Sequence, residues 1–219
     1  MVDIARYVGE ELGVSTSFVS GTPGDIVRLA DDGRLDMAFA LEPITAAWLK
    51  EHVTSNPYFV AHQRLLVGRR SGIGGVSELE GKRVCQSVDP LSEVRVEELA
   101  TETGPAVDAS VPRCIALLRH GRVDAVTASD VRLMPASGPG SGFAIVGDQL
   151  STEGYGIVGA PEGKGWSGYL DARLSSFKSE GGWISSYDRW IPNRVPDPVS
   201  EPPRMTSGGA AALFPEAIP

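Results

Sequence analysis

The chain has 219 residues, of which 42% are hydrophobic, and its formal net charge is −8. A chain of this size can bury one sizeable core or two small ones. Its acidic balance, with no basic cluster larger than Arg69-Arg70, argues against a nucleic-acid partner. Apolar runs fall short of the roughly 18 residues of a membrane helix, and Asp3, Arg6 and Glu10 interrupt the apolar stretch that a signal peptide would need.

The first predicted elements are a helix and a strand. Asp3 fits the N-cap of the helix and Gly13 fits its end, and the apolar face between them is formed by Ile4, Val8 and Leu12. The alternating residues that follow predict a strand over 14–18.

A helix that ends in Gly-Arg-apolar-Asp and leads into a short apolar strand occurs twice. The first copy spans 26–40 around Gly33, and the second spans 114–129 around Gly121. Each glycine supplies the left-handed residue that ends the helix, and the apolar residues after the aspartate suit a buried strand. Two similar α/β halves predict two lobes with a cleft between them.

The remaining elements alternate in the same α/β manner. Around the repeats we expect a short helix from Pro43 through Trp48, a strand over 64–68 that leaves the first lobe, a turn and strand ending at Cys85, a helix over 91–103, a surface loop over 137–142, strands over 143–146 and 155–159, and helices over 169–177 and 183–190. The proline-rich residues from Pro192 onward predict a disordered tail or linker. The predicted lobes are therefore 1–66 plus 149–191 and 67–148, with a tail over 192–219.

Two cysteines, Cys85 and Cys114, occupy a predicted strand and the start of a predicted helix in the same lobe. They fit a disulfide, which would indicate an oxidising compartment, or two unrelated buried thiols; a catalytic cysteine fits less well. The histidines at 52, 62 and 120 show no metal-ligand spacing, and no metal or other cofactor is predicted.

An ordered set of short motifs resembles the extracytoplasmic solute-binding proteins of family 3, which serve importers of polar amino acids. The motifs include Asp3-Ile4-Ala5, the two Gly-Arg-apolar-Asp units, Asn56-Pro57-Tyr58, Tyr155-Gly156-Ile157 and a terminal Tyr-Asp-Arg-Trp. The resemblance covers about residues 2–191 and is greatest to actinobacterial glutamine or glutamate binders, in which the two cysteines pair. It implies a type II periplasmic-binding-protein-like α/β fold with two lobes, a two-strand hinge and closure around a small ligand.

The resemblance also implies a ligand site, and this sequence departs from it. The family holds the α-carboxylate with an arginine and a helix N-terminus, and the ammonium with an aspartate. Here Trp48 stands at the arginine position, Pro43 replaces a hydroxyl residue, Asp89 enters the anion cradle, and Ser129 replaces the aspartate. The candidate cleft positions are Glu42, Pro43, Thr45, Trp48, Asp89, Leu91, Ser92, Ser129 and Asp130.

These departures change the expected ligand. Removing one partner of a desolvated charge pair typically costs roughly 2–5 kcal/mol, and Asp89 would add repulsion. We therefore expect either a ligand other than an ordinary α-amino acid, with a cation facing Asp89 and an aromatic-compatible group on Trp48, or no ligand. In the simpler interpretation Trp48 packs and Asp89 is an N-cap.

The main functional expectation is the substrate-binding component of an ABC importer for a small polar solute. It would be a monomer, not an enzyme, and would work with permease subunits. A non-transporting sensor or interaction domain is the alternative, and a dehydratase-like enzyme using Glu42, Asp89 or Asp130 is a minor one.

Family members begin with a central strand before the Asp-Ile-Ala helix, whereas this sequence begins at Met1. We therefore expect the true start to lie upstream or the gene to be decayed. An upstream signal peptide would make the protein extracytoplasmic, either secreted or lipid-anchored.

Overall fold

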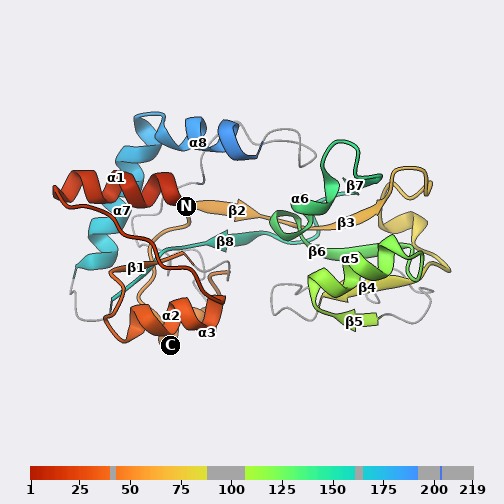
Figure 1. The fold of residues 1–219 in the computed structure, drawn as a ribbon, viewed down its shortest axis with the longest axis horizontal. Helices are drawn as coiled ribbons and strands as arrows, with labels where there is room; N and C mark the ends of the chain where they lie inside the picture. Colours follow the sequence, from red (N-terminus) through yellow and green to blue (C-terminus); the bar gives the residue numbers. More distant parts are fainter. Residues whose placement is uncertain (40–42, 88–106, 161–164, 192–202, 204–219) are drawn as a thin grey trace. The chain divides into compact units, whose positions relative to one another are not determined.

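The computed structural model describes residues 1–39, 43–87, 107–160, 165–191 and 203, and the chain divides into two compact units (Figure 1). Unit 1 comprises 1–60, 154–190 and 199–219, and unit 2 comprises 61–153 and 191–198. Two of the boundaries fall inside β2 (Phe59–Ala61) and β8 (Glu153–Tyr155), which pair as a two-stranded sheet. These units change at 60/61 and 153/154, a few residues from the predicted 66/67 and 148/149, because β3 (Gln63–Gly68) pairs with strands of unit 2 and the Leu150 backbone donates to the Gln63 carbonyl.

Unit 2 is organised around a five-stranded mixed sheet of order β5-β4-β6-β3-β7. β4 runs parallel to β5 and β6, whereas β3 runs antiparallel to β6 and β7. The strands are β3 (Gln63–Gly68), β4 (Val84–Ser87), β5 (Val107–Ala109), β6 (Ala125–Ser129) and β7 (Phe143–Val146).

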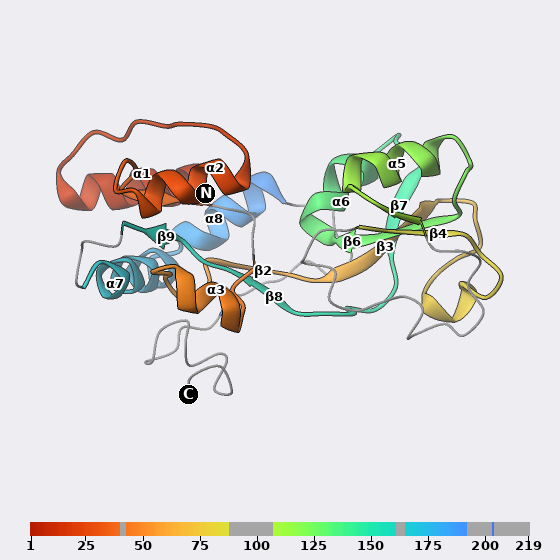
Figure 2. The same cartoon turned by 90° about the horizontal axis from the view of Figure 1, so that it is seen from below.

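Both faces of this sheet are covered (Figure 2). α5 (Val111–Arg119) and α6 (Asp130–Ser137) pack on one face, and the 73–79 segment, which includes η1 (Val76–Glu78), covers the other. Consecutive residues of β3 alternate between the two cores, since Leu66 belongs to the helix side and Leu65 to the other.

The disulfide between Cys85 and Cys114 confirms the predicted pairing. It joins β4 to α5 inside the helix-side core, where both residues are fully buried. The bond therefore links a strand to the helix that covers it.

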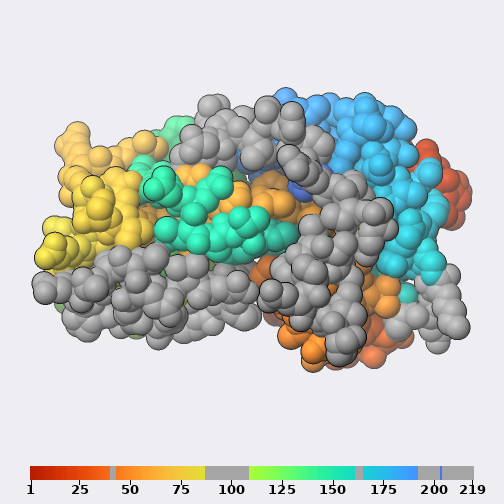
Figure 3. Space-filling view, turned by 180° about the vertical axis from the view of Figure 1, so that it is seen from behind, coloured from red at the N-terminus to blue at the C-terminus, as the bar shows by residue number. Residues whose placement is uncertain are grey.

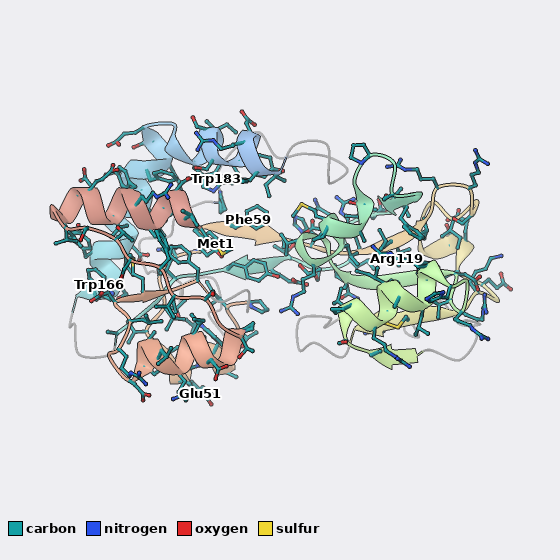
Figure 4. The ribbon with its side chains drawn as sticks, viewed as in Figure 1. Met1, Glu51, Phe59, Arg119, Trp166 and Trp183 are labelled. Atoms are coloured by element: carbon teal, nitrogen blue, oxygen red, sulfur yellow. A yellow bond between two sulfur atoms is a disulfide. The ribbon has the colours of Figure 1, made fainter. Side chains whose placement is uncertain are left out.

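Unit 1 contains more helix and less sheet. Its strands β1 (Met37–Ala38) and β9 (Val158–Gly159) pair antiparallel, and its helices are α1 (Val2–Leu12), α2 (Pro23–Asp31), α3 (Ala46–Glu51), α7 (Trp166–Ser179) and α8 (Gly182–Trp190). Aromatic rings join α8 to β2, because Tyr187 stacks on both Trp183 and Phe59; the latter two residues are labelled in Figure 4. The Trp183 indole N–H also donates to the Tyr58 carbonyl at 2.7 Å.

The two copies of the repeat end their helices in the same way. Gly33 and Gly121 have φ of 69° and 63°, in the left-handed region. In each copy the residue after the glycine donates to a carbonyl five positions earlier, Arg34 to Leu29 and Arg122 to Leu117, at 2.9 Å in both cases. The helix ends predicted from the repeat are therefore confirmed in both units.

Several local predictions were wrong. Residues 14–18 form no strand, and the side chains of Val14 and Phe18 are 58% and 52% exposed, because alternation makes a strand only where a neighbouring strand accepts its hydrogen bonds. Asp3 lies in the first turn of α1, whose N-cap is Met1. The strand expected over 155–159 is divided between β8 and β9. The predicted helix over 91–103 lies outside the described residues, as does all of the tail except Pro203.

Candidate functional site

The predicted site residues that the structure describes fall into two groups. Pro43, Thr45 and Trp48 belong to unit 1, and Ser129 and Asp130 belong to unit 2. The other candidates lie outside the described residues, namely Glu42, Asp89, Leu91 and Ser92.

In unit 1, the three positions surround the start of α3. Pro43 is buried and forms a bridge with Tyr155. The Thr45 hydroxyl accepts a hydrogen bond from the backbone N–H of Trp48 at 3.1 Å and so caps the helix. This explains why threonine suits the position whether or not a ligand binds there.

The Trp48 side chain makes several contacts within its own unit. Its indole N–H donates to the Thr54 hydroxyl at 3.0 Å, and its ring lies 4.2 Å from that of His52. The ring also packs against the small core of Ala30, Ala38 and Val158. These contacts give Trp48 the packing role of the simpler interpretation.

In unit 2, Ser129 ends β6 and Asp130 begins α6. The site thus lies at the carboxyl end of a strand that is parallel to β4, and ligands of open α/β sheets bind at such ends. Ser129 and Asp130 are both buried, with exposed fractions of 1% and 6%.

Asp130 has an unusual environment for a carboxylate. Among the described residues, its Oδ1 atom is buried without a hydrogen-bond partner. Burial raises the pKa of Asp130, and this effect is opposed by backbone hydrogen bonds from His62 and Val131 and by the nearby charges of His62 and Arg64. An N–H or cationic group brought to Oδ1 would supply the missing partner.

A buried polar cluster beside Asp130 was missed in the sequence. The Gln63 amide donates to Thr127 at 2.9 Å, the Gln63 backbone donates to the Ser151 hydroxyl at 3.0 Å, and that hydroxyl donates to Glu153 at 3.0 Å. The Arg64 guanidinium donates to the Gly147 carbonyl at 2.7 Å. The available signal was the polar run His62-Gln63-Arg64 opening an otherwise apolar strand.

The polar cluster also fixes the loop that returns toward β8. The His62 ring Nδ1 lies 2.8 Å from the Ser151 carbonyl, and the Leu150 backbone donates to the Gln63 carbonyl at 2.9 Å. Asp130 donates its own backbone N–H to the His62 carbonyl at 2.9 Å. The start of α6 and the residues before β8 are thereby held to the start of β3.

The fold with two α/β units and paired connecting strands defines a class of two-lobed binding proteins. A family model described as bacterial extracellular solute-binding proteins, family 3, matches residues 1–193. The chain belongs to this family.

Curated relatives and solved structures agree with this assignment. The chain is 25% identical over 194 residues to the ABC transporter glutamine-binding protein GlnH of Bacillus subtilis, covering 87% of this chain and 71% of the relative. It is 26% identical to a glutamine-binding protein of Geobacillus stearothermophilus, with 75% of this chain and 64% of that protein covered. An ancestral arginine-binding protein bound to glutamine is similar with a TM-score of 0.66 and 26% identity, over 87% and 86% of the two chains.

The predicted type II periplasmic-binding-protein-like fold is therefore confirmed, as is the solute-binding role. The relatives are binding proteins rather than enzymes, and the family is described as extracellular. Within the described residues, no helix is long and apolar enough to cross a membrane, and no group of three His, Cys, Asp or Glu side chains could hold a metal ion.

Proposed function

We propose that this protein is the substrate-binding component of an ABC importer, and that it captures a small polar solute carrying a cationic or N–H donor group. The observation that carries the ligand class is the buried Asp130 carboxylate, whose Oδ1 lacks a partner among the described residues. The amino-acid transport role is supported by the names of the relatives.

The position of Asp130 supports a ligand contact. It lies directly after Ser129, the position at which the family resemblance expects the ammonium-binding aspartate. A buried carboxylate oxygen without a hydrogen-bond partner destabilises a protein, so the Oδ1 atom of Asp130 is explained by a ligand that completes its hydrogen bonding.

The unit 1 positions support a ligand without an ordinary α-carboxylate contact. Trp48 supplies no cation, and its indole N–H is already bonded to Thr54. A solute without a carboxylate for an arginine to bind, such as an amine or a quaternary ammonium compound, therefore fits better than glutamine in the family pose.

A ligand panel tests this proposal. The purified protein is heated with arginine, ornithine, glutamine, glutamate, choline or putrescine, and binding is confirmed by calorimetry. A true ligand at about 100 times its Kd adds about 2.7 kcal/mol to the free energy of unfolding, which raises Tm by roughly 5–10 °C in a chain of this size. Tight binding of glutamate or glutamine would overturn the proposal of a ligand without an ordinary α-carboxylate contact, while leaving the solute-binding role intact.

Two variants make the role of Asp130 specific. Asp130→Asn is expected to abolish binding of the cationic ligand and to stabilise the unliganded protein, because an amide pays no penalty for a buried charge. Asp148→Asn removes an exposed carboxylate of the same unit and should change neither property. Unchanged affinity in Asp130→Asn would contradict the assignment.

We further propose that the protein acts as a monomer outside the cytoplasm, secreted or lipid-anchored, and delivers its solute to permease subunits. Fractionation of the native host, together with co-purification of the permease, tests this part. Recovery in the cytosolic fraction without a permease would favour the sensor alternative.

A further inference from the structure

Unit 2 has a cavity of about 680 Å³ whose lining does not include Ser129 or Asp130. It is lined by the turn after β3 (Gly68–Ser71), by residues that precede β4 and β6, and by the start of β7. Figure 3 shows the segment after β3, in yellow, at the surface of this unit. We call this cavity the basic pocket, after its residues Arg69, Arg70 and Lys82.

The basic pocket is separate from the Asp130 site. Lys82 and Asp124 precede the parallel strands β4 and β6, whereas Ser129 and Asp130 follow β6. β6 has five residues, so at about 3.3 Å per residue the two ends of the sheet lie about 15 Å apart. The pocket therefore opens at the amino ends of these strands.

The charge of the basic pocket is positive in an otherwise acidic chain. Among the described residues that line it, the one acidic side chain, Asp124, is already engaged, with Oδ1 at 2.9 Å and Oδ2 at 3.0 Å from the Arg83 guanidinium. That pairing holds the pKa of Asp124 below its usual range. In the part of the chain that the structure describes, no ion pair joins Arg69, Arg70 or Lys82 to a carboxylate.

The basic pocket also has an apolar wall. Leu118 and Val123 are buried side chains of the helix-side core that line it, and the half-buried Phe143 packs against the same core. The Arg69 guanidinium donates to the Ser137 carbonyl at 3.4 Å, which anchors it beside the pocket with further donors left over. Three cations beside an apolar wall fit a multiply charged anion attached to an apolar body.

We infer that the basic pocket binds a phosphate group attached to an apolar moiety. A phosphate offers more charge and more acceptor oxygens than a single carboxylate, and arginine forks match its geometry. The volume exceeds the size of a bare inorganic anion, which leaves room for the apolar part on the wall of Leu118, Val123 and Phe143. The same chemistry is presented by soluble organic phosphates and by phospholipid headgroups.

Calorimetry and vesicle sedimentation distinguish these two sources. Phenyl phosphate and inorganic phosphate are titrated into the full chain at low salt, and the chain is sedimented with phosphatidylglycerol or phosphatidylcholine vesicles. Binding of phenyl phosphate that is tighter than that of inorganic phosphate indicates a soluble ligand. Sedimentation with phosphatidylglycerol vesicles but not with phosphatidylcholine vesicles indicates a lipid headgroup. Absence of binding in both calorimetry and sedimentation overturns the inference.

Matched variants separate the pocket from general charge. The triple variant Arg69→Gln/Arg70→Gln/Lys82→Gln should weaken the affinity for whichever phosphate probe binds the wild type by at least about tenfold. The control Arg34→Gln/Arg113→Gln/Arg119→Gln changes the net charge equally at exposed residues that do not line the pocket, and should leave binding unchanged; Arg119 is labelled on α5 in Figure 4. Equal losses in both triple variants would contradict a specific site.

If the triple variant of the pocket unfolds, the single variant Arg70→Gln takes its place, because the Arg70 side chain is exposed and makes no polar contact to another described residue. A several-fold loss of affinity for that phosphate probe is expected. Full wild-type affinity in both Arg70→Gln and Lys82→Gln would refute the pocket. The solute panel is repeated on the same variants. Unchanged Asp130-dependent binding there shows that the two sites fail independently.

Discussion

The two units use the same repeated helix and turn but surround it differently. In unit 2 the strand of the repeat, β6, lies in the middle of a five-stranded sheet with both faces covered and a disulfide in its core. In unit 1 the corresponding strand, β1, has two residues and pairs with the two-residue β9. The large hydrophobic side chains that are exposed among the described residues all belong to unit 1: Met1, Val2, Leu12, Val14, Phe18, Val19 and Trp190.

The comparison teaches that a local signal fixes a helix end, whereas the stability of a strand depends on its neighbours. We therefore expect unit 1 to unfold before unit 2. The four tryptophans, at 48, 166, 183 and 190, all belong to unit 1, so their fluorescence follows that unit alone. Amide exchange of β6 follows unit 2.

Removal of the disulfide is expected to change the difference in stability between the two units most. Cys85→Ser/Cys114→Ser opens a loop with a sequence separation of 29 and should cost unit 2 about 3–4 kcal/mol. The denaturant concentration at which the β6 amides lose their protection should fall toward the midpoint of the tryptophan transition. The tryptophan midpoint itself is the internal control, and an equal shift of both signals would show that the units do not unfold separately.

A smaller effect, confined to unit 1, is expected at Gly156. A Cβ built there would lie 2.4 Å from the Thr54 methyl and 2.9 Å from the Ser55 carbonyl oxygen. Because the backbone atom cannot move aside, Gly156→Ala should destabilise unit 1 by roughly 1–3 kcal/mol in the tryptophan transition.

Gly168→Ala is the matched control for Gly156. It lies within α7, where an added Cβ meets no atom within 4 Å, and should stabilise the same unit by roughly 0.5–1 kcal/mol. Destabilisation of similar size in both variants would contradict the steric explanation.

Sequence reasoning succeeded where the determining contacts are local. The left-handed glycines at 33 and 121 follow from a helix pattern and the next few residues, and the cysteine pair follows from a strand and helix in one lobe. It failed where the contact is distant. Residues 14–18 alternate correctly but find no partner strand among the described residues, and the unit boundary depends on how β3 pairs with β6 and β7.

The sequence indicated candidate positions for a site but not their environment. Ser129 and Asp130 can be placed at the end of a buried strand from the sequence. The surroundings that leave Asp130 Oδ1 without a hydrogen-bond partner include β3, which is distant in the sequence and pairs with β6. The hydrogen bond from the Trp48 indole N–H to Thr54 was likewise not indicated by the sequence.

The repeat itself offers a comparison of equal changes in the two units. Gly33→Ala and Gly121→Ala each force a side chain into the left-handed region with no steric obstacle, since nothing lies within 4 Å of either added Cβ. Each should cost roughly 1 kcal/mol, the first in the tryptophan transition and the second in exchange of β6. A cost in one unit alone would show that the two helix ends are not equivalent.

The smallest effect is a pH dependence of unit 1. The Lys178 ammonium donates to the Pro57 and Pro203 carbonyls at 2.8 and 3.0 Å, and burial lowers its pKa to about 8, opposed by the charge of Asp171. Because the unfolded chain keeps this lysine protonated up to its ordinary pKa near 10.5, the unfolded state binds more protons between pH 8 and 10.5. The contribution of Lys178 to the free energy of unfolding should therefore rise with pH in this window.

Lys178→Met removes the titration and should flatten that part of the pH profile. The buried Tyr58, whose pKa burial raises, contributes the opposite slope above pH 10, so the difference between wild type and variant is measured between pH 8 and 9.5. Tryptophan-monitored unfolding gives the profile of unit 1, and exchange of the β6 amides should show no difference between the two proteins. Parallel profiles of wild type and Lys178→Met in the tryptophan signal would mean that Lys178 carries the same charge in the folded and unfolded states.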